Sequence, residues 1–103
     1  MKVFISCPMK DRTENEILAE RNFAKSEIKE RFGDEDIQFI DSYFKEFKLN
    51  EQSLNTAVYC LGRAIVKLSE ADIVVFCRGW ELARGCRIEH TIAQDYGMDI
   101  ILL

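Results

Sequence analysis

Short apolar runs alternate along the chain with longer stretches in which apolar residues recur every three or four positions. Residues 73–77 are five consecutive apolar side chains without polar alternation, which is typical of a strand in a sheet covered on both faces. The longer stretches have the period of amphipathic helices. The predicted strands are 3–7, 37–40, 73–77 and 99–103, the predicted helices are about 14–32, 51–69 and 84–96, and 41–50 is an aromatic-rich loop.

Polar residues at the ends of these stretches support the helix assignments. Thr13 and Glu16 have the spacing of a capping box, in which each side chain bonds the other residue's backbone amide. Gly33 suits the positive-φ turn that ends a helix, and Asn50 is a good N-cap for the second helix. The first two helices therefore have recognisable starts, and the first has a recognisable end.

The strict alternation of strands and helices predicts an α/β fold in a single domain, residues 1–103. We expect an open, parallel, four-stranded sheet of order 2-1-3-4 with helices on both faces. This order places the loops after Cys7 and Cys77 on either side of one crevice. Open α/β sheets bind ligands in the crevice beyond the carboxyl ends of their strands.

Composition excludes several classes of partner. The net charge is −4 and no basic stripe is present, which argues against binding to a nucleic-acid polymer. No apolar run reaches the length of a membrane span or a signal peptide, so we expect a cytoplasmic protein with no membrane partner. None of the four cysteines forms a CxxC pair, and most should be reduced, buried side chains in that compartment.

Glu89 is the strongest candidate for chemistry. It follows a Gly-punctuated loop and lies about one turn into the third predicted helix, where the helix macrodipole would hold a carboxylate ionised. An ionised carboxylate can stabilise the positive charge that develops when an N-glycosidic bond breaks, or form a glycosyl-enzyme. The alternative is a solvated helix residue paired with Arg84 or Arg87.

Four short sequence segments give this chain a specific resemblance to a known family. The motif residues are Ser6-Cys7-Pro8-Met9, Ala71-Asp72, Gly79-Trp80-Glu81 and Arg84-Gly85-Cys86-Arg87-Ile88-Glu89-His90. With the order of elements, they resemble the nucleoside 2-deoxyribosyltransferase superfamily, in particular its small members from phage and bacterial genomes. The resemblance covers nearly the whole chain. It implies a flavodoxin-like fold, a homodimer or higher homo-oligomer, and transfer or hydrolysis of the sugar of a nucleoside or nucleotide, with Glu89 as the nucleophile.

The chain departs from the family pattern at two positions that matter for catalysis. Ala83 and Ala64 stand where the transferases have aspartates. Their loss removes the usual proton donor to the leaving base and a group that orients the base. Glu81 and His90 are the replacements that the sequence offers.

We predict that residues around the crevice bind the substrate. Arg12, near a helix N-terminus, and Arg84 offer contacts to a phosphate. Trp80 either stacks on a base or packs against a neighbouring subunit, and Asp72 is also typical of a turn. The predicted substrate-binding residues are Ser6, Cys7, Pro8, Met9, Arg12, Tyr43, Asp72, Gly79, Trp80, Arg84 and Gly85.

No cofactor and no metal is expected, although one rival arrangement involves zinc. Cys86 and His90 share a helix face, and Cys7 and Cys77 end neighbouring predicted strands. These ligand types suit zinc, but their spacing fits no zinc motif. A nucleophilic Cys86 is a second rival, for which no acid that would orient a His90 base is evident.

Two function hypotheses from different classes follow. The first is an N-glycosidase or glycosyltransferase that acts on a nucleotide or nucleoside through Glu89. The second is a non-catalytic nucleotide-binding protein that keeps the pocket and sequesters a nucleotide signal. In either case the apolar stripe Leu54, Val58, Leu61 and Ile65 favours a helix-mediated homodimer or larger homo-oligomer.

Overall fold

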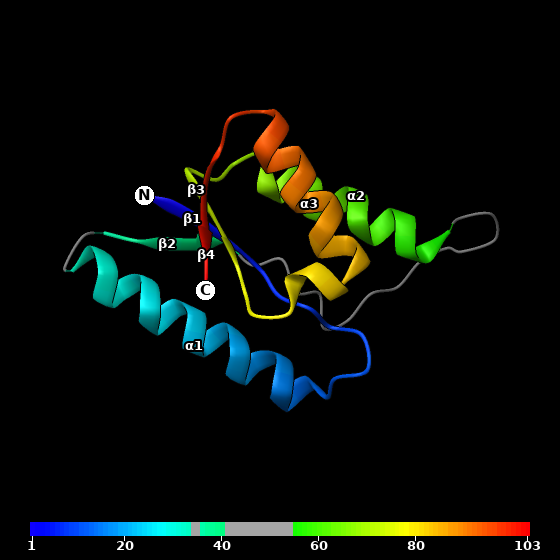
Figure 1. The fold of residues 1–103 in the computed structure, drawn as a ribbon, viewed down its shortest axis with the longest axis horizontal. Helices are drawn as coiled ribbons and strands as arrows, with labels where there is room; N and C mark the ends of the chain where they lie inside the picture. The colour runs from blue at the N-terminus through cyan, green and yellow to red at the C-terminus, as the bar shows by residue number, and fades with distance from the viewer. Residues whose placement is uncertain (34–35, 41–54) are drawn as a thin grey trace.

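The centre of the protein is a four-stranded parallel sheet of order β2-β1-β3-β4, as the sequence predicts. The computed structural model describes residues 1–33, 36–40 and 55–103. Figure 1 shows α1 on one face of the sheet and α2 and α3 on the other. The strands are β1 Lys2–Ser6, β2 Gln38–Ile40, β3 Ile73–Phe76 and β4 Asp99–Leu102; the helices are α1 Glu14–Phe32, α2 Thr56–Leu68, α3 Arg84–Asp95 and a short 3₁₀ helix, η1, Trp80–Leu82.

Strand alternation divides the apolar residues between two cores. Side chains two residues apart on a strand point to the same face. Val3, Ile5 and Cys7 therefore pack with Ala24 and Ile28 of α1. On the opposite face, the core beneath α2 and α3 holds Phe4, Ile40, Leu68, Val74, Phe76 and Ala93.

The ends of the helices agree in part with the sequence analysis. The capping box is confirmed: the Glu16 amide donates to Thr13 Oγ1 at 3.1 Å, and the Thr13 amide donates to Glu16 Oε1 at 2.8 Å. Gly33 follows α1 with a φ of 67°. The predicted start of the second helix is wrong, because α2 begins at Thr56 and the Asn55 side chain caps it. Asn50 and the predicted loop at 41–50 lie outside the described residues.

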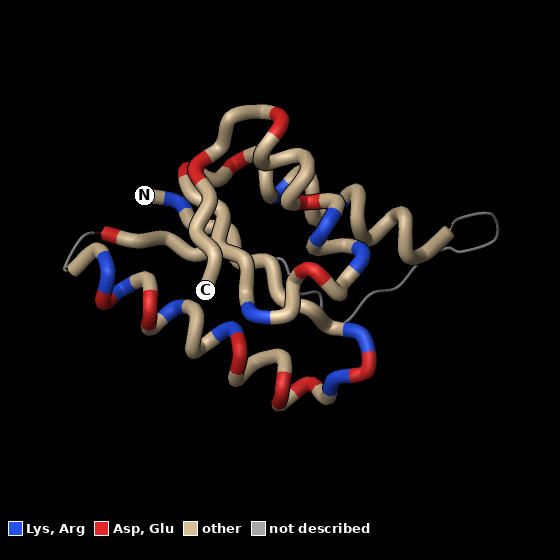
Figure 2. The backbone as a smooth tube through the Cα atoms, viewed as in Figure 1, with Lys and Arg blue, Asp and Glu red and all other residues tan. Residues whose placement is uncertain are grey.

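The long helix α1 carries charge of both signs along its length. Its acidic and basic positions are mixed (Figure 2). Among the described helices, none combines the length and the apolar character needed to cross a membrane.

Candidate functional site

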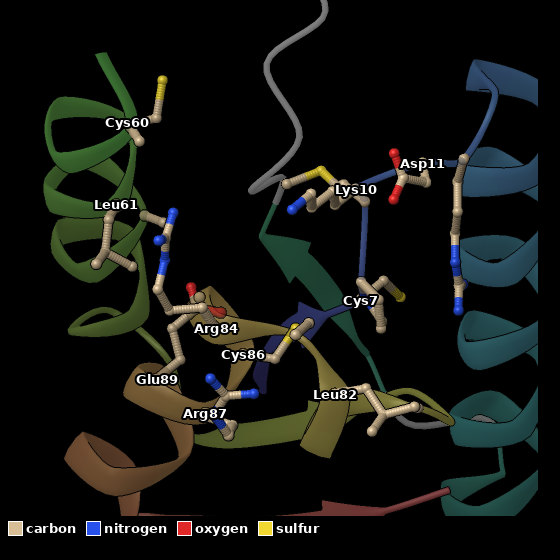
Figure 3. A pocket seen from close by; sticks show the side chains of 18 residues that line it. Cys7, Lys10, Asp11, Cys60, Leu61, Leu82, Arg84, Cys86, Arg87 and Glu89 are labelled. Atoms are coloured by element: carbon tan, nitrogen blue, oxygen red, sulfur yellow. The ribbon is translucent and has the colours of Figure 1, made fainter. Parts of the chain in front are cut away.

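A cavity of about 650 Å³ opens at the carboxyl ends of β1 and β3. Three segments supply its walls: the loop after β1, one face of α2, and the stretch from Gly79 to the first turns of α3. Figure 3 shows Cys60 and Leu61 of α2 across the cavity from Lys10 and Asp11 of the β1 loop. The predicted site residues that line it are Cys7, Pro8, Met9, Arg12, Gly79, Arg84, Gly85 and Glu89.

The loops after β1 and β3 approach each other closely at Gly79. Gly79 has a φ of 85°, a backbone conformation that residues with a side chain rarely adopt. A Cβ atom built on it would lie in ordinary contact with the β1 loop, 3.6 Å from Arg12 Nη2 and 3.9 Å from Pro8 Cγ. Glycine is therefore favoured at this position by the positive φ and not by a lack of space for a side chain. The turn brings the two predicted crevice loops into one wall.

Glu89 lines the cavity as a buried carboxylate, with 7% of its surface exposed. Ser6, the last residue of β1, donates a hydrogen bond from Oγ to Glu89 Oε1 at 2.7 Å. Ser6 is on the same strand face as Phe4, toward α3, so alternation along β1 aims its hydroxyl at this helix. The interpretation of Glu89 as a solvated residue is therefore wrong.

The electrostatic environment of Glu89 differs from the expected one. Glu89 is the sixth residue of α3, in its second turn, whereas the macrodipole acts mainly within the first turn. Burial raises the pKa of Glu89 above its ordinary value, opposed by the hydrogen bond from Ser6 and by the charge of Arg21. We expected a carboxylate that the helix start keeps ionised. Burial disfavours the charged form of Glu89, and its effect on the pKa is larger than the opposing effects of Ser6 and Arg21.

Basic side chains surround the cavity. Lys10, Arg12, Arg84 and Arg87 all line it, and Arg87 Nη1 also donates to the Glu81 carbonyl at 3.0 Å. The described lining residues contribute two carboxyl groups, Asp11 and Glu89. Four cations against two acids favour an anionic ligand.

The wall formed by α2 was missed in the sequence analysis. Ala57, Cys60, Leu61 and Ala64 line the cavity, at the spacing of residues on one helix face. The sequence signal was present, because three of these four side chains are small. Of this face, the sequence points only to Ala64, as the position of a family aspartate, and the small side chains around it are the signal of a wall that leaves room for a ligand.

A comparison with known families shows the family of this chain. A family profile matches residues 1–102, and its description is a domain of unknown function, DUF4406. The chain belongs to the DUF4406 family. No curated protein and no solved structure matches it.

Five residues singled out in the sequence are absent from the cavity lining of this DUF4406 domain: Ser6, Asp72, Trp80, Glu81 and His90. The Trp80 ring stacks on His90 at 4.2 Å between centroids, and neither ring lines the cavity. Glu81 is also absent from the lining, so neither proposed replacement for the lost aspartates faces it. Asp72 lies at the amino ends of the strands, far from the cavity at their carboxyl ends, and its Oδ2 accepts from the Lys2 amide at 2.7 Å. Tyr43 lies outside the described residues.

The cysteines of this family member also differ from expectation. Cys7 and Cys77 form a disulfide with 5.0 Å between their Cα atoms, while Cys60 and Cys86 are free. The expectation that most cysteines are reduced is therefore wrong for two of the four. The disulfide follows from register, because Cys7 and Cys77 come directly after the paired residues Ser6 and Phe76.

The two rival site chemistries receive no support from this arrangement. The Cys7 and Cys77 sulfurs are bonded to each other, and no group of three or more potential metal ligands occurs in the described part of the chain. Burial raises the pKa of the Cys86 thiol, opposed by Ser6, while the nearby Glu89 carboxylate raises it further. A raised pKa disfavours the thiolate that a nucleophilic cysteine needs.

Proposed function

We propose that this protein is an N-glycosidase or glycosyltransferase that acts on a nucleotide or nucleoside, with Glu89 as the nucleophile. The observation that carries the proposal is a buried carboxylate, held by Ser6, in the wall of a cavity with four basic side chains. A cavity of about 650 Å³ falls within the range of small-molecule sites, roughly 300–1,000 Å³. The sequence segments that resemble the nucleoside 2-deoxyribosyltransferase superfamily support this proposal.

The proposed reaction has two steps. A carboxylate oxygen of Glu89 attacks the anomeric carbon, the bond from that carbon to the base nitrogen breaks, and the electron pair stays on the base. The base nitrogen takes up a proton, for which Asp11 is the other carboxyl group on the described cavity wall. Water, or the N–H of a second base, then adds to the same carbon, returns its proton to the Asp11 carboxylate and releases Glu89. Lys10, Arg12, Arg84 and Arg87 would hold phosphate oxygens of a nucleotide.

The raised pKa of Glu89 gives this reaction a characteristic pH dependence. A nucleophilic carboxylate must be ionised, and Glu89 loses its proton at a higher pH than an ordinary glutamate. Turnover should therefore fall on the acid side at a higher pH than the usual carboxyl pKa would set.

The test is release of free base from a panel of nucleosides, nucleoside monophosphates and cyclic nucleotides, measured by chromatography. We expect the wild type to release base from at least one of them and Glu89→Gln to reduce release to background. Asp11→Asn should slow the reaction if this residue supplies the proton. Glu30→Gln, an exposed change in α1, is the matched control and should behave as wild type. Equal release by Glu89→Gln and wild type would overturn the proposal.

A second function, nucleotide binding without turnover, is favoured by one observation. Ala64 and Ala83, at the positions of the family's aspartates, both line the cavity, so the chain lacks two carboxyl groups inside the proposed site. A nucleotide that raises the melting temperature without releasing base would establish this function instead. Either function is proposed for the cytoplasm, with a small-molecule partner and a homodimer or larger homo-oligomer, without a nucleic-acid polymer.

A further inference from the structure

Ser6 is buried beneath the cavity wall rather than exposed in it. It is 2% exposed and is absent from the cavity lining, although its hydroxyl bonds Glu89 Oε1 at 2.7 Å. Ser6 is therefore not the substrate-binding residue of the cavity wall that its sequence motif predicts. Its location argues for action through Glu89 instead, because its hydroxyl donates to that carboxylate. The same hydroxyl also interacts with the buried Cys86 thiol.

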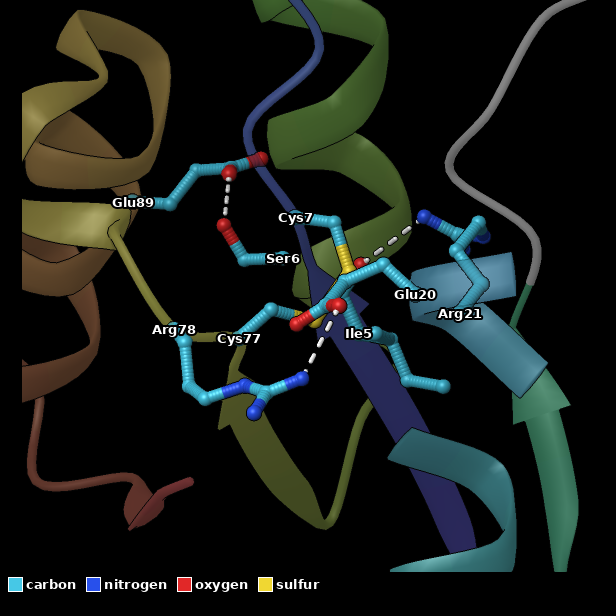
Figure 4. The surroundings of a disulfide bond; sticks show 8 residues. All are labelled: Ile5, Ser6, Cys7, Glu20, Arg21, Cys77, Arg78 and Glu89. Carbon is cyan, nitrogen blue, oxygen red and sulfur yellow. Dashed lines mark hydrogen bonds and ion pairs between the residues drawn. A yellow bond between two sulfur atoms is a disulfide. The ribbon is translucent and has the colours of Figure 1, made fainter. Parts of the chain in front are cut away.

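The backbone that carries the Ser6 hydroxyl is fixed by the sheet. β1 is a central strand, flanked by β2 and β3, and Ser6 is paired in register with Phe76. The Ser6 carbonyl accepts from the Cys77 amide at 2.9 Å, and the next residue carries the Cys7–Cys77 disulfide. Figure 4 shows the bond from Ser6 to Glu89 beside this disulfide. A donor on such a rigid element holds its acceptor more precisely than one on a loop.

We propose that Ser6 is a positioning residue, which fixes Glu89 Oε1 from β1 and so leaves Oε2 as the oxygen that attacks the anomeric carbon. A glutamate side chain has several rotatable bonds, and a buried hydrogen bond to one oxygen removes most of that freedom. The same bond stabilises the ionised form, which the buried site otherwise disfavours. This inference rests on the proposed function for its chemical meaning, but the contact between Ser6 and Glu89 is tested independently.

The test compares Ser6→Ala with Ser6→Thr, which restores a hydroxyl, and with Thr91→Val. Thr91 is an exposed α3 residue whose hydroxyl donates to the Arg87 carbonyl at 3.0 Å, so its loss is a matched control on the same helix. We expect Ser6→Ala to lower kcat by up to about 100-fold with little change in KM, and to move the acid limb of the pH profile upward. Ser6→Thr should recover part of kcat, and Thr91→Val should match wild type.

Titration of the Glu89 carboxyl carbon by ¹³C NMR separates this inference from the proposed function. In Ser6→Ala the titration midpoint of Glu89 should shift to higher pH, because the hydrogen bond that favours the ionised form is gone. An unchanged midpoint would overturn the role of Ser6, whether or not the wild type turns over. If the wild type does not turn over but the midpoint shifts in Ser6→Ala, the proposed function is overturned. The hydrogen bond from Ser6 to Glu89 is then still established.

Discussion

At the scale of single residues, the protein places three polar side chains in its interior. Ser6, Arg21 and Glu89 are the buried polar residues among those described. Arg21 Nη1 donates to the Ile5 carbonyl at 3.3 Å, and its charge lowers the pKa of Glu89. Burial still prevails and raises that pKa overall. An ionised Glu89 therefore costs the fold stability, a cost that is common where a site is built for function.

Replacing Glu89 by glutamine should stabilise the protein at neutral pH. Because the folded-state pKa of Glu89 is raised, the folded protein binds more protons than the unfolded chain between the ordinary value of 4.5 and the raised value. Wild-type stability therefore falls as pH rises through that window. Glu89→Gln does not titrate, so its melting temperature should exceed that of wild type by a few degrees at neutral pH, as about 1 kcal/mol produces in a small domain.

Thermal melts followed by circular dichroism at neutral pH and below pH 4.5 would check this prediction. The difference between the two proteins should shrink at the acidic pH, where Glu89 is protonated in both states of the wild type. A difference that is equal at both pH values would contradict it.

At the scale of elements, α2 is arranged for the cavity more than for the core. Leu68 is the buried residue of this helix, whereas Val58 and Val66 are each 63% exposed. Ala57 and Ala64 face the cavity, where a longer side chain would occupy space that a ligand needs. The position of α2 therefore sets the width of the site.

Enlarging Ala64 should block the cavity. We expect Ala64→Leu to weaken binding of the most stabilising nucleoside monophosphate at least about tenfold, because the added atoms overpack a ligand-filled space. Val66→Leu is the control, since Val66 is on the same helix and exposed. Isothermal titration calorimetry would measure both affinities. Equal affinities for the two variants would show that α2 does not limit the space that the ligand occupies.

Pattern and capping residues predicted the order of the elements and most of their bounds, but not the start of α2. The apolar period runs back to Leu54, and both Asn50 and Asn55 are suitable caps. The structure uses Asn55, whose side chain accepts from the Val58 amide at 3.1 Å. Asn50 and Asn55 are equally suitable N-cap residues, so N-cap preference alone does not decide which of them starts the helix.

At the scale of the whole molecule, the register of β1 against β3 decides which side chains meet. Ser6 and Cys7 are adjacent in sequence but point to opposite faces, so Ser6 reaches Glu89 on α3 and Cys7 joins the core beneath α1. A slip of one residue would reverse them. Glu89 was predicted from its motif and its place at the sheet edge. Its bond to Ser6 and the disulfide were not, because both depend on register.

The disulfide gives a direct test of the register. Cys7 and Cys77 are 70 residues apart, so closing this loop should stabilise the fold by about 4 kcal/mol through the unfolded chain. We expect two reactive thiols in unreduced, denatured protein and four after reduction. The Cys7→Ser, Cys77→Ser double variant should melt at a lower temperature. Four thiols before reduction would contradict the disulfide and agree with the reduced state usual in cytoplasm.

The separation of Ser6 and Glu89 by 83 residues has a consequence for the order in which the protein is made. A growing chain presents Ser6 and the basic β1 loop first, and the α2 wall about fifty residues later. The carboxylate arrives with α3, close to the end of the matched family domain. An incomplete chain would therefore carry part of the basic cavity wall without Glu89, the residue that we propose as the nucleophile.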